Sequence, residues 1–164
     1  FRSYAATIAC KYGKKVILNP APASSLSNSF LMNVHTILPN RIEAEMLSGI
    51  KVMNIESAHR AAQAIGEKGI ENVVITLGKD GAYVKEKDEY TMIPAKEVET
   101  IDTTGAGDAF IGSLLYQLAE DGVTTDSIAD LTEDKLEEYL KKSNGYCAKS
   151  VLENGAIASY PTSL

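Results

Sequence analysis

The sequence predicts an α/β fold in which a mostly parallel sheet is covered by helices on both faces. Helix-like and strand-like patterns alternate along most of the 164 residues, as they do in proteins with parallel sheets. The strand-like segments are short, uninterrupted apolar runs, which are typical of strands buried on both faces. The composition, 45% apolar and 23% charged, is that of an ordinary globular domain and excludes disordered, collagen-like and low-complexity chains.

In the first half, segments with helical spacing are separated by short strands. Ala58, Ala61, Ala62 and Ile65 follow the i, i+3, i+4, i+7 pattern of one helix face, and Gly69 is the expected end of that helix. The elements expected here are a helix over 1–10 that ends near Gly13, a strand over 16–18, a weak helix over 24–34, a strand over 36–38, a helix over 41–47 that ends at Gly49, and a helix from Ser57.

The second half begins with the strongest strand signal, the β-branched run 73–77. Residues 81–84 and 90–93 then form an expected hairpin across the charged turn 85–89. A glycine-rich turn is expected after 98–101, and then a long helix that ends at Gly122, with Ala109, Leu114, Leu115 and Leu118 inward. A polar linker over 123–131 leads to a helix that is capped by Thr132 and has Leu136, Tyr139, Leu140 and Cys147 on one side. The tail over 155–161 is expected to be irregular or strand-like.

Charge and cysteine content exclude several classes of function. The net charge is −6, and no cluster of basic residues amounts to the patch expected of a nucleic-acid-binding domain. No apolar run is long enough for a membrane span, and no signal-peptide pattern opens the chain. Cys10 and Cys147 lie far apart without a C-x-x-C pattern. We therefore expect two buried thiols in a cytoplasmic, reducing compartment.

The most informative stretch is 102–110, which reads DTTGAGDAF. The small residues Gly105, Ala106 and Gly107 stand directly before the long helix, so backbone N–H groups and the helix dipole are positioned to hold a phosphate. Asp108 in the first turn could accept a proton from an attacking hydroxyl, or it could merely cap the helix. A dinucleotide fingerprint is disfavoured because Phe110 replaces its third glycine, and no P-loop motif is present.

This stretch closely resembles the C-terminal signature of the ribokinase-like (PfkB) sugar kinases. Four further stretches resemble family motifs in the same order: residues 19–23, residues 39–45 with the N-x-x-E motif, residues 76–81, and Asn144 followed by 155–159. The resemblance implies that residues 1–164 are the C-terminal, ATP-binding and catalytic part of a single ribokinase-like domain. Since the chain opens at Phe1 in the middle of a helical pattern, we expect a fragment from which the N-terminal half is absent.

The resemblance implies a role for each matching residue. Asp108 would be the general base that takes the proton of a sugar's primary hydroxyl, and Gly105, Ala106 and Gly107 would form an anion hole for the γ-phosphoryl group. Asn40 and Glu43 would organise Mg²⁺, largely through waters, and the phosphates. From the residues alone, Asn40 as a helix N-cap with acids near the dipole is the favoured interpretation.

The remaining matches concern ATP and a monovalent cation. Thr76 and Gly78 would lie at the ribose and phosphates of ATP, Gly81 would allow close approach of the backbone, and Asn144 would lie against the adenine or be an ordinary surface residue. By analogy, a K⁺ ion would lie between two loops that contain Asp102, Thr104, Ser150, Gly155 and Ser159.

The expected function is therefore ATP-dependent phosphorylation of a sugar, with Mg²⁺ and K⁺. D-ribose, converted to ribose 5-phosphate, is the first candidate substrate. The first alternative is a fructokinase or another sugar or nucleoside kinase of the family, and the second alternative is a nucleotide-binding module without catalysis.

The expected partners are the sugar and the missing N-terminal half, which supplies most sugar contacts and a β lid in this family. Lid strands commonly form a dimer, so a homodimeric whole protein is compatible with the resemblance. Neither nucleic acid nor a membrane is expected as a partner.

Overall fold

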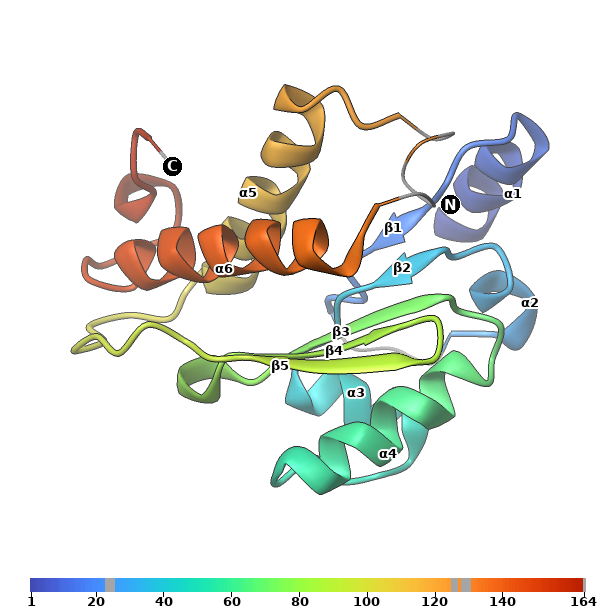
Figure 1. The fold of residues 1–164 in the computed structure, drawn as a ribbon, viewed down its shortest axis with the longest axis horizontal. Helices are drawn as coiled ribbons and strands as arrows, with labels where there is room; N and C mark the ends of the chain where they lie inside the picture. Colours follow the sequence, from blue (N-terminus) through green and yellow to red (C-terminus); the bar gives the residue numbers. More distant parts are fainter. Residues whose placement is uncertain (23–25, 125–126, 128–130, 164) are drawn as a thin grey trace. The chain divides into compact units, whose positions relative to one another are not determined.

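The computed structural model describes residues 1–22, 26–124, 127 and 131–163. In chain order, its elements are α1 (Arg2–Lys11), β1 (Ile17–Leu18), α2 (Asn28–Leu31), β2 (Thr36–Ile37), α3 (Arg41–Ser48), α4 (Ile55–Gly66), β3 (Asn72–Thr76), the 3₁₀ turn η1 (Gly78–Asp80), β4 (Ala82–Glu86), β5 (Glu89–Ile93), α5 (Ala106–Glu120), α6 (Glu133–Ser150) and the 3₁₀ turn η3 (Ile157–Ser159) (Figure 1). They belong to two compact units, one formed by Phe1–Leu77 with Ala82–Met92 and the other by Gly78–Gly81 with Ile93–Leu164.

The first unit contains the sheet, whose strand order is β1-β2-β3-β4-β5. β2 pairs in parallel with both β1 and β3, whereas β4 is antiparallel to β3. The sheet is therefore mixed, and the prediction of a mostly parallel sheet is corrected. The physical reason is the connection: a parallel pair needs a crossover of a dozen or more residues, and only the short η1 turn separates β3 from β4.

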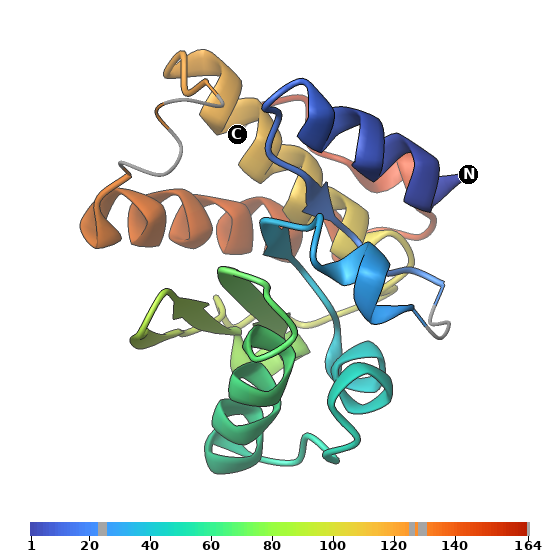
Figure 2. The ribbon, with the colours of Figure 1, turned by 90° about the vertical axis from the view of Figure 1, so that its right-hand side faces the viewer.

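Apolar side chains of α4 and the central strands form the core of the first unit. The core contains the four predicted residues of α4, which are Ala58, Ala61, Ala62 and Ile65, together with Ile37, Val73 and Ile75 of the sheet. α3 and α4 lie on one side of the sheet, as both ribbon views show (Figures 1 and 2). The α/β class is thus confirmed in this unit, and helices on the second face stay a prediction.

The second unit is built around α5 and α6, which pack against each other (Figure 2). Leu114, Leu118, Tyr139 and Leu140 are buried, as their helical spacing predicts, whereas Leu115, which was also predicted to face inward, is 44% exposed. Gln117 of α5 is also buried, and its side-chain amide donates to the backbone oxygen of Tyr139 at 3.1 Å. The same amide also donates to the hydroxyl of Ser143, which is buried in α6, at 3.1 Å. The two helices are thus joined by polar bonds as well as by apolar contacts.

Several local predictions differ from the structure. Within the described part of the weak helix predicted over 24–34, the structure has the four-residue helix α2, capped by Ser27. Of the two alternatives predicted for the tail, irregular or strand-like, the structure has the irregular one, which contains the turn η3. Cys10 is exposed and Cys147 is half-buried, so the prediction of two buried thiols is wrong; Ala6 is the only buried residue of α1, the helix that carries Cys10. Ala23 of the 19–23 motif and most of the predicted polar linker lie outside the described residues.

Candidate functional site

The glycine-rich turn forms the N-terminus of α5, as predicted. Gly105 is the N-cap in the left-handed conformation, with φ of 75°, and Ala106, Gly107 and Asp108 form the first turn. The Ala109 N–H donates to the Gly105 oxygen at 2.8 Å, and the Ala106 N–H donates to the Thr103 oxygen at 3.1 Å. Helix geometry leaves the amides of a first turn without intrahelical partners. A Cβ atom added to Gly107 would meet nothing within 4 Å, so open space lies beside this turn.

Glycine is needed at position 105 for two reasons. Its positive φ is unfavourable for residues that carry a Cβ atom. In addition, such an atom would collide with the hydroxyl of Tyr160 and would lie 2.9 Å from the Cβ of Ala156. The tail after α6 therefore packs directly against the N-terminus of α5.

Asp102 ties the loop before α5 to the same tail. One carboxylate oxygen accepts hydrogen bonds from the N–H of Thr104 at 2.9 Å and from its hydroxyl at 2.7 Å. The other oxygen accepts the N–H of Gly155 at 2.8 Å. These bonds, that of Gly155 first, lower the pKa of Asp102 below its ordinary value. The structure thus brings Asp102, Thr104 and Gly155 together, as the resemblance implies.

The two predicted serines differ in their surroundings. The Ser159 hydroxyl lies 2.6 Å from the oxygen of Gly155 and 2.7 Å from that of Ala156, within the tail. The buried Ser150 hydroxyl donates to the Cys147 oxygen one turn earlier in α6, at 2.8 Å. Ser159 is therefore part of the loop pair around Asp102, whereas the hydroxyl of Ser150 bonds within its own helix.

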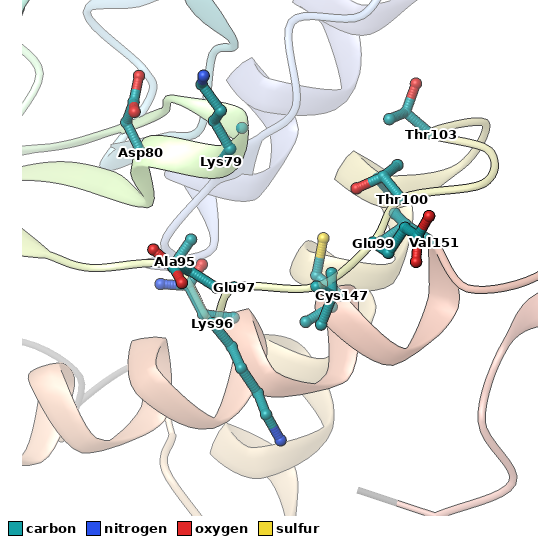
Figure 3. Close-up of a pocket in the computed structure, with 15 residues that line it drawn as sticks. Lys79, Asp80, Ala95, Lys96, Glu97, Glu99, Thr100, Thr103, Cys147 and Val151 are labelled. Atoms are coloured by element: carbon teal, nitrogen blue, oxygen red, sulfur yellow. The ribbon is translucent and has the colours of Figure 1, made fainter.

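A cavity of about 740 Å³ lies within the second unit. Three predicted residues line it together, namely Gly78, Ala106 and Asn144. Figure 3 shows Lys79 and Asp80 opposite Thr100 and Thr103, with the sulfur of Cys147 directed into the space between them. The size suits a nucleotide-sized ligand, since ligand cavities typically measure about 300–1,000 Å³.

Sequence reasoning missed much of the lining of this cavity. The missed residues include Thr103, the segment 95–100, Ala148 of α6 and Val151 at the C-cap of that helix. A signal for the helical part exists, because residues 144, 147, 148 and 151 follow the i, i+3, i+4, i+7 spacing of one helix face. No comparable pattern marks the irregular segment 95–100.

Two further predicted residues contact the segment that follows β5. The side-chain amide of Asn144 donates to the Pro94 oxygen at 3.2 Å, and the same residue lines the cavity. A Cβ atom on Gly81 would collide with the Ile93 oxygen and lie 2.7 Å from the Ala95 nitrogen. The close approach that Gly81 permits is therefore to the chain's own backbone.

Asp108 lines a second cavity of about 410 Å³ in the same unit, together with Tyr116, Tyr146 and Tyr160. Burial raises the pKa of Tyr160, and the negative charge of Asp108 raises it further. Ala106 and Asp108, which are two residues apart, thus face two different cavities.

The predicted residues of the first unit form a separate group. The Glu43 N–H donates to the side-chain oxygen of Asn40 at 3.0 Å, and the Asn40 N–H donates to the Glu43 carboxylate at 2.8 Å, which is a reciprocal capping box at the start of α3. Glu43 is buried. Thr76, at the end of β3, pairs with Asn40 in an isolated parallel bridge.

Metal clusters and membrane helices are both absent from the part of the chain that the structure describes. In residues 1–22, 26–124, 127 and 131–163, no three His, Cys, Asp or Glu side chains are arranged to hold a metal ion. Within the same ranges, none of the helices has the length and apolar character that crossing a membrane requires.

Comparison with known proteins assigns the fold to a family. The model of the pfkB family of carbohydrate kinases matches residues 3–163. The ribokinase of Haemophilus influenzae is 41% identical over 158 residues, which are 96% of this chain and 48% of that protein. The chain therefore spans about half the length of the curated relatives it matches.

Two solved structures show the same fold. The ribokinase of Arabidopsis thaliana, complexed with ribose and ATP, has a TM-score of 0.81 at 23% identity, over 98% of this chain and 48% of that one. A fructokinase double mutant from Vibrio cholerae, in its fructose-, ADP- and potassium-bound form, has a TM-score of 0.74 at 27% identity, over 96% of this chain and 51% of that one.

Proposed function

The chain belongs to the pfkB family of carbohydrate kinases, and we propose that the whole protein transfers the γ-phosphoryl group of ATP to the primary hydroxyl of a sugar. The observation that carries this proposal is the N-terminus of α5, where residues without large side chains form a first turn beside open space and Asp108 stands in the same turn. Phosphoryl transfer depends mainly on positioning and on stabilisation of charge, and this turn supplies both a candidate base and a candidate anion hole.

In the proposed mechanism, Asp108 accepts the proton of the sugar hydroxyl as its oxygen attacks phosphorus. The amides of the first turn of α5 donate hydrogen bonds to the γ-phosphoryl oxygens, whose charge the positive end of the helix dipole also stabilises. ATP itself would occupy the 740 Å³ cavity, where the oxygen of Asn144 is an acceptor for the base and the η1 turn offers backbone N–H groups and the Lys79 ammonium.

The residues present fit the two cations that the family resemblance implies. Mg²⁺ retains several waters and needs few protein ligands, so the single carboxylate of Glu43 at the start of α3 suits it. For K⁺, the Asp102 carboxylate and the carbonyl oxygens of Gly155 and Ala156 form a donor set of the right chemistry. When bound, the cations would offset phosphate charge and hold the two loops together.

D-ribose is the first candidate sugar, because ribokinases are the relatives that cover almost the whole chain at about 40% identity. Fructose is the second, because the fructokinase from V. cholerae shares the fold at 27% identity. A nucleotide-binding module without catalysis would bind ATP and release no ADP with either sugar.

The substitution Asp108→Asn in the whole protein tests the proposal. Loss of the base should lower kcat at least about a hundredfold, and ATP affinity should change little, because the base acts mainly in the transition state. The rate is measured by coupled ADP release with ribose and fructose, and ATP affinity by calorimetry. The control is Asp134→Asn, which makes the same change in the first turn of α6 at an exposed position. Retention of more than about a tenth of kcat by Asp108→Asn would refute the role of this carboxylate.

A further inference from the structure

Gly105 is held from outside its own helix by Tyr160. The phenol O–H of Tyr160 donates to the Gly105 oxygen at 3.0 Å, across 55 residues of chain. The same oxygen accepts the Ala109 N–H, which is the first intrahelical bond of α5. Tyr160 therefore bonds to the peptide from which the first turn extends.

The position of Tyr160 is itself fixed by its neighbours. Tyr146 of α6 donates its hydroxyl hydrogen to the oxygen of Pro161 at 2.9 Å. On the N-terminal side of Tyr160, the Gly155 N–H donates to the carboxylate of Asp102, and the Ser159 hydroxyl donates to the Gly155 oxygen. The tail is thus attached on both sides of Tyr160, so this phenol is held against Gly105.

The contact between Tyr160 and Gly105 is also tight. A Cβ atom at position 105 would lie 3.2 Å from the Cζ atom of Tyr160. Because a peptide group is planar, fixing the Gly105 carbonyl also fixes the plane that carries the next N–H and sets where the first turn begins. A shift of this peptide would redirect all the first-turn amides at once.

We propose that Tyr160 is a positioning residue, which holds Gly105 so that the first-turn amides of α5 are directed at the γ-phosphoryl group of the nucleotide. The inference rests on the proposed function, because it assumes that these amides form the anion hole. It adds a residue from outside the glycine-rich turn, which the sequence motif does not contain. Tyr160 acts through Gly105 and does not itself touch the nucleotide.

The phenol is suited to this role because it stays protonated. Burial and the nearby Asp108 carboxylate both raise the pKa of Tyr160. It therefore remains a neutral hydrogen-bond donor throughout the neutral pH range. A donor is required here, since the group it contacts is a carbonyl oxygen, which can only accept.

The test compares two nucleotides that differ in the γ-phosphoryl group. The 164-residue chain and its Tyr160→Phe variant are titrated by calorimetry with ADP and with the methylene analogue of ATP. Phenylalanine keeps the ring that packs at Gly105 and removes only the hydroxyl. Loss of one neutral hydrogen bond corresponds to about fivefold in affinity. We expect that loss for the ATP analogue and less than about twofold for ADP.

A second measurement follows the turn directly. Hydrogen–deuterium exchange of the Ala109 N–H, which bonds to the Gly105 oxygen, and of the Ala106 N–H, which bonds to the Thr103 oxygen, should be faster in Tyr160→Phe than in the wild-type chain, with a similar melting temperature. The matched control is Tyr116→Phe, which lines the same cavity as Tyr160 but hydrogen-bonds to Glu120 rather than to the glycine-rich turn. This control should change neither the nucleotide preference nor the exchange rate.

The outcomes separate the two proposals. A wild-type chain that binds ADP and the ATP analogue equally well would contradict the anion hole, and with it the role of Tyr160. If the wild-type chain prefers the analogue and Tyr160→Phe keeps that preference, only the role of Tyr160 is refuted. Equal weakening of both nucleotides would show a general structural effect and would also refute it.

Discussion

The carboxylate of Glu43 has two candidate roles at one position. It accepts the Asn40 N–H in the capping box of α3, and it is the residue proposed to organise Mg²⁺. The two roles make different demands, because a capping box can use glutamine as well as glutamate, whereas a magnesium ion and its waters favour a charged oxygen ligand.

Glu43→Gln should therefore raise the Mg²⁺ concentration needed for half-maximal rate several-fold and change the melting temperature little. Both are measured on the whole protein, with Mg²⁺ titrated at fixed ATP. The control is Ser57→Ala, which breaks the equivalent capping box of α4. That variant should lower the stability by about 1 kcal/mol and leave the Mg²⁺ dependence unchanged. An unchanged Mg²⁺ requirement in Glu43→Gln would leave Glu43 with the capping role alone.

Single residues were predictable from sequence where a local motif determines their conformation. Gly105 as the residue before the helix and Asp108 in its first turn follow from the order of residues in 102–110. Tyr160 could not be found in this way, because its contact with Gly105 depends on where the tail returns after α6. Gly81 was singled out for a close backbone approach, but local sequence does not show that the neighbour is the segment after β5.

At the scale of elements, Asp102 joins the loop before α5 to the tail after α6. Its hydrogen bonds to Thr104 and Gly155 lower its pKa. A carboxylate whose pKa is lowered by folding stabilises the folded state at pH values above its ordinary pKa, and this contribution disappears as the pH falls through the lowered value.

Asp102→Asn should therefore be less stable than the wild-type chain at pH 7, because the new amide places a donor beside a backbone N–H that needs an acceptor. The difference in the free energy of unfolding between the two chains should shrink as the pH falls below 3.8, the ordinary pKa of an aspartate side chain. Urea midpoints at several pH values between 7 and 3 measure this trend. A difference in midpoint that stays constant over that range would show that the ionised carboxylate does not hold the loop and the tail together.

Elements with strong periodicity were predictable, and elements that depend on pairing or on distant contacts were not. The inward face of α4 follows directly from residues 58, 61, 62 and 65. The orientation of β4 against β3 depends on the length of the η1 turn, which places the two strands side by side without a crossover. The segment 95–100 lines the cavity without regular structure, so it has no period to recognise.

At the scale of the whole molecule, the chain accounts for about half of a protein of its family. The candidate groups for ATP, the base and the anion hole are all within these 164 residues. We propose, from the family resemblance, that most contacts to the sugar come from residues outside this chain. Orientation of the attacking hydroxyl can lower the barrier of a reaction by about 7–11 kcal/mol. A chain without the sugar contacts would lack this contribution, so it should bind the nucleotide and still fail to phosphorylate the sugar.

We therefore expect the 164-residue polypeptide alone to bind ATP weakly and to release no ADP in the presence of ribose or fructose. The two cavities of the second unit are lined by residues of this chain. Without the lid that the family resemblance implies, the amide dipoles proposed to face the phosphates would act in water, where they are weaker. Calorimetry with ATP and a coupled ADP assay with both sugars measure the two properties on one preparation, and the Asp108→Asn chain gives the background. Sugar-dependent ADP release above that background would show that residues 1–164 position the sugar themselves. If the 164-residue chain binds ATP without turnover, and a polypeptide as long as the relatives phosphorylates the sugar, the sugar contacts lie outside residues 1–164.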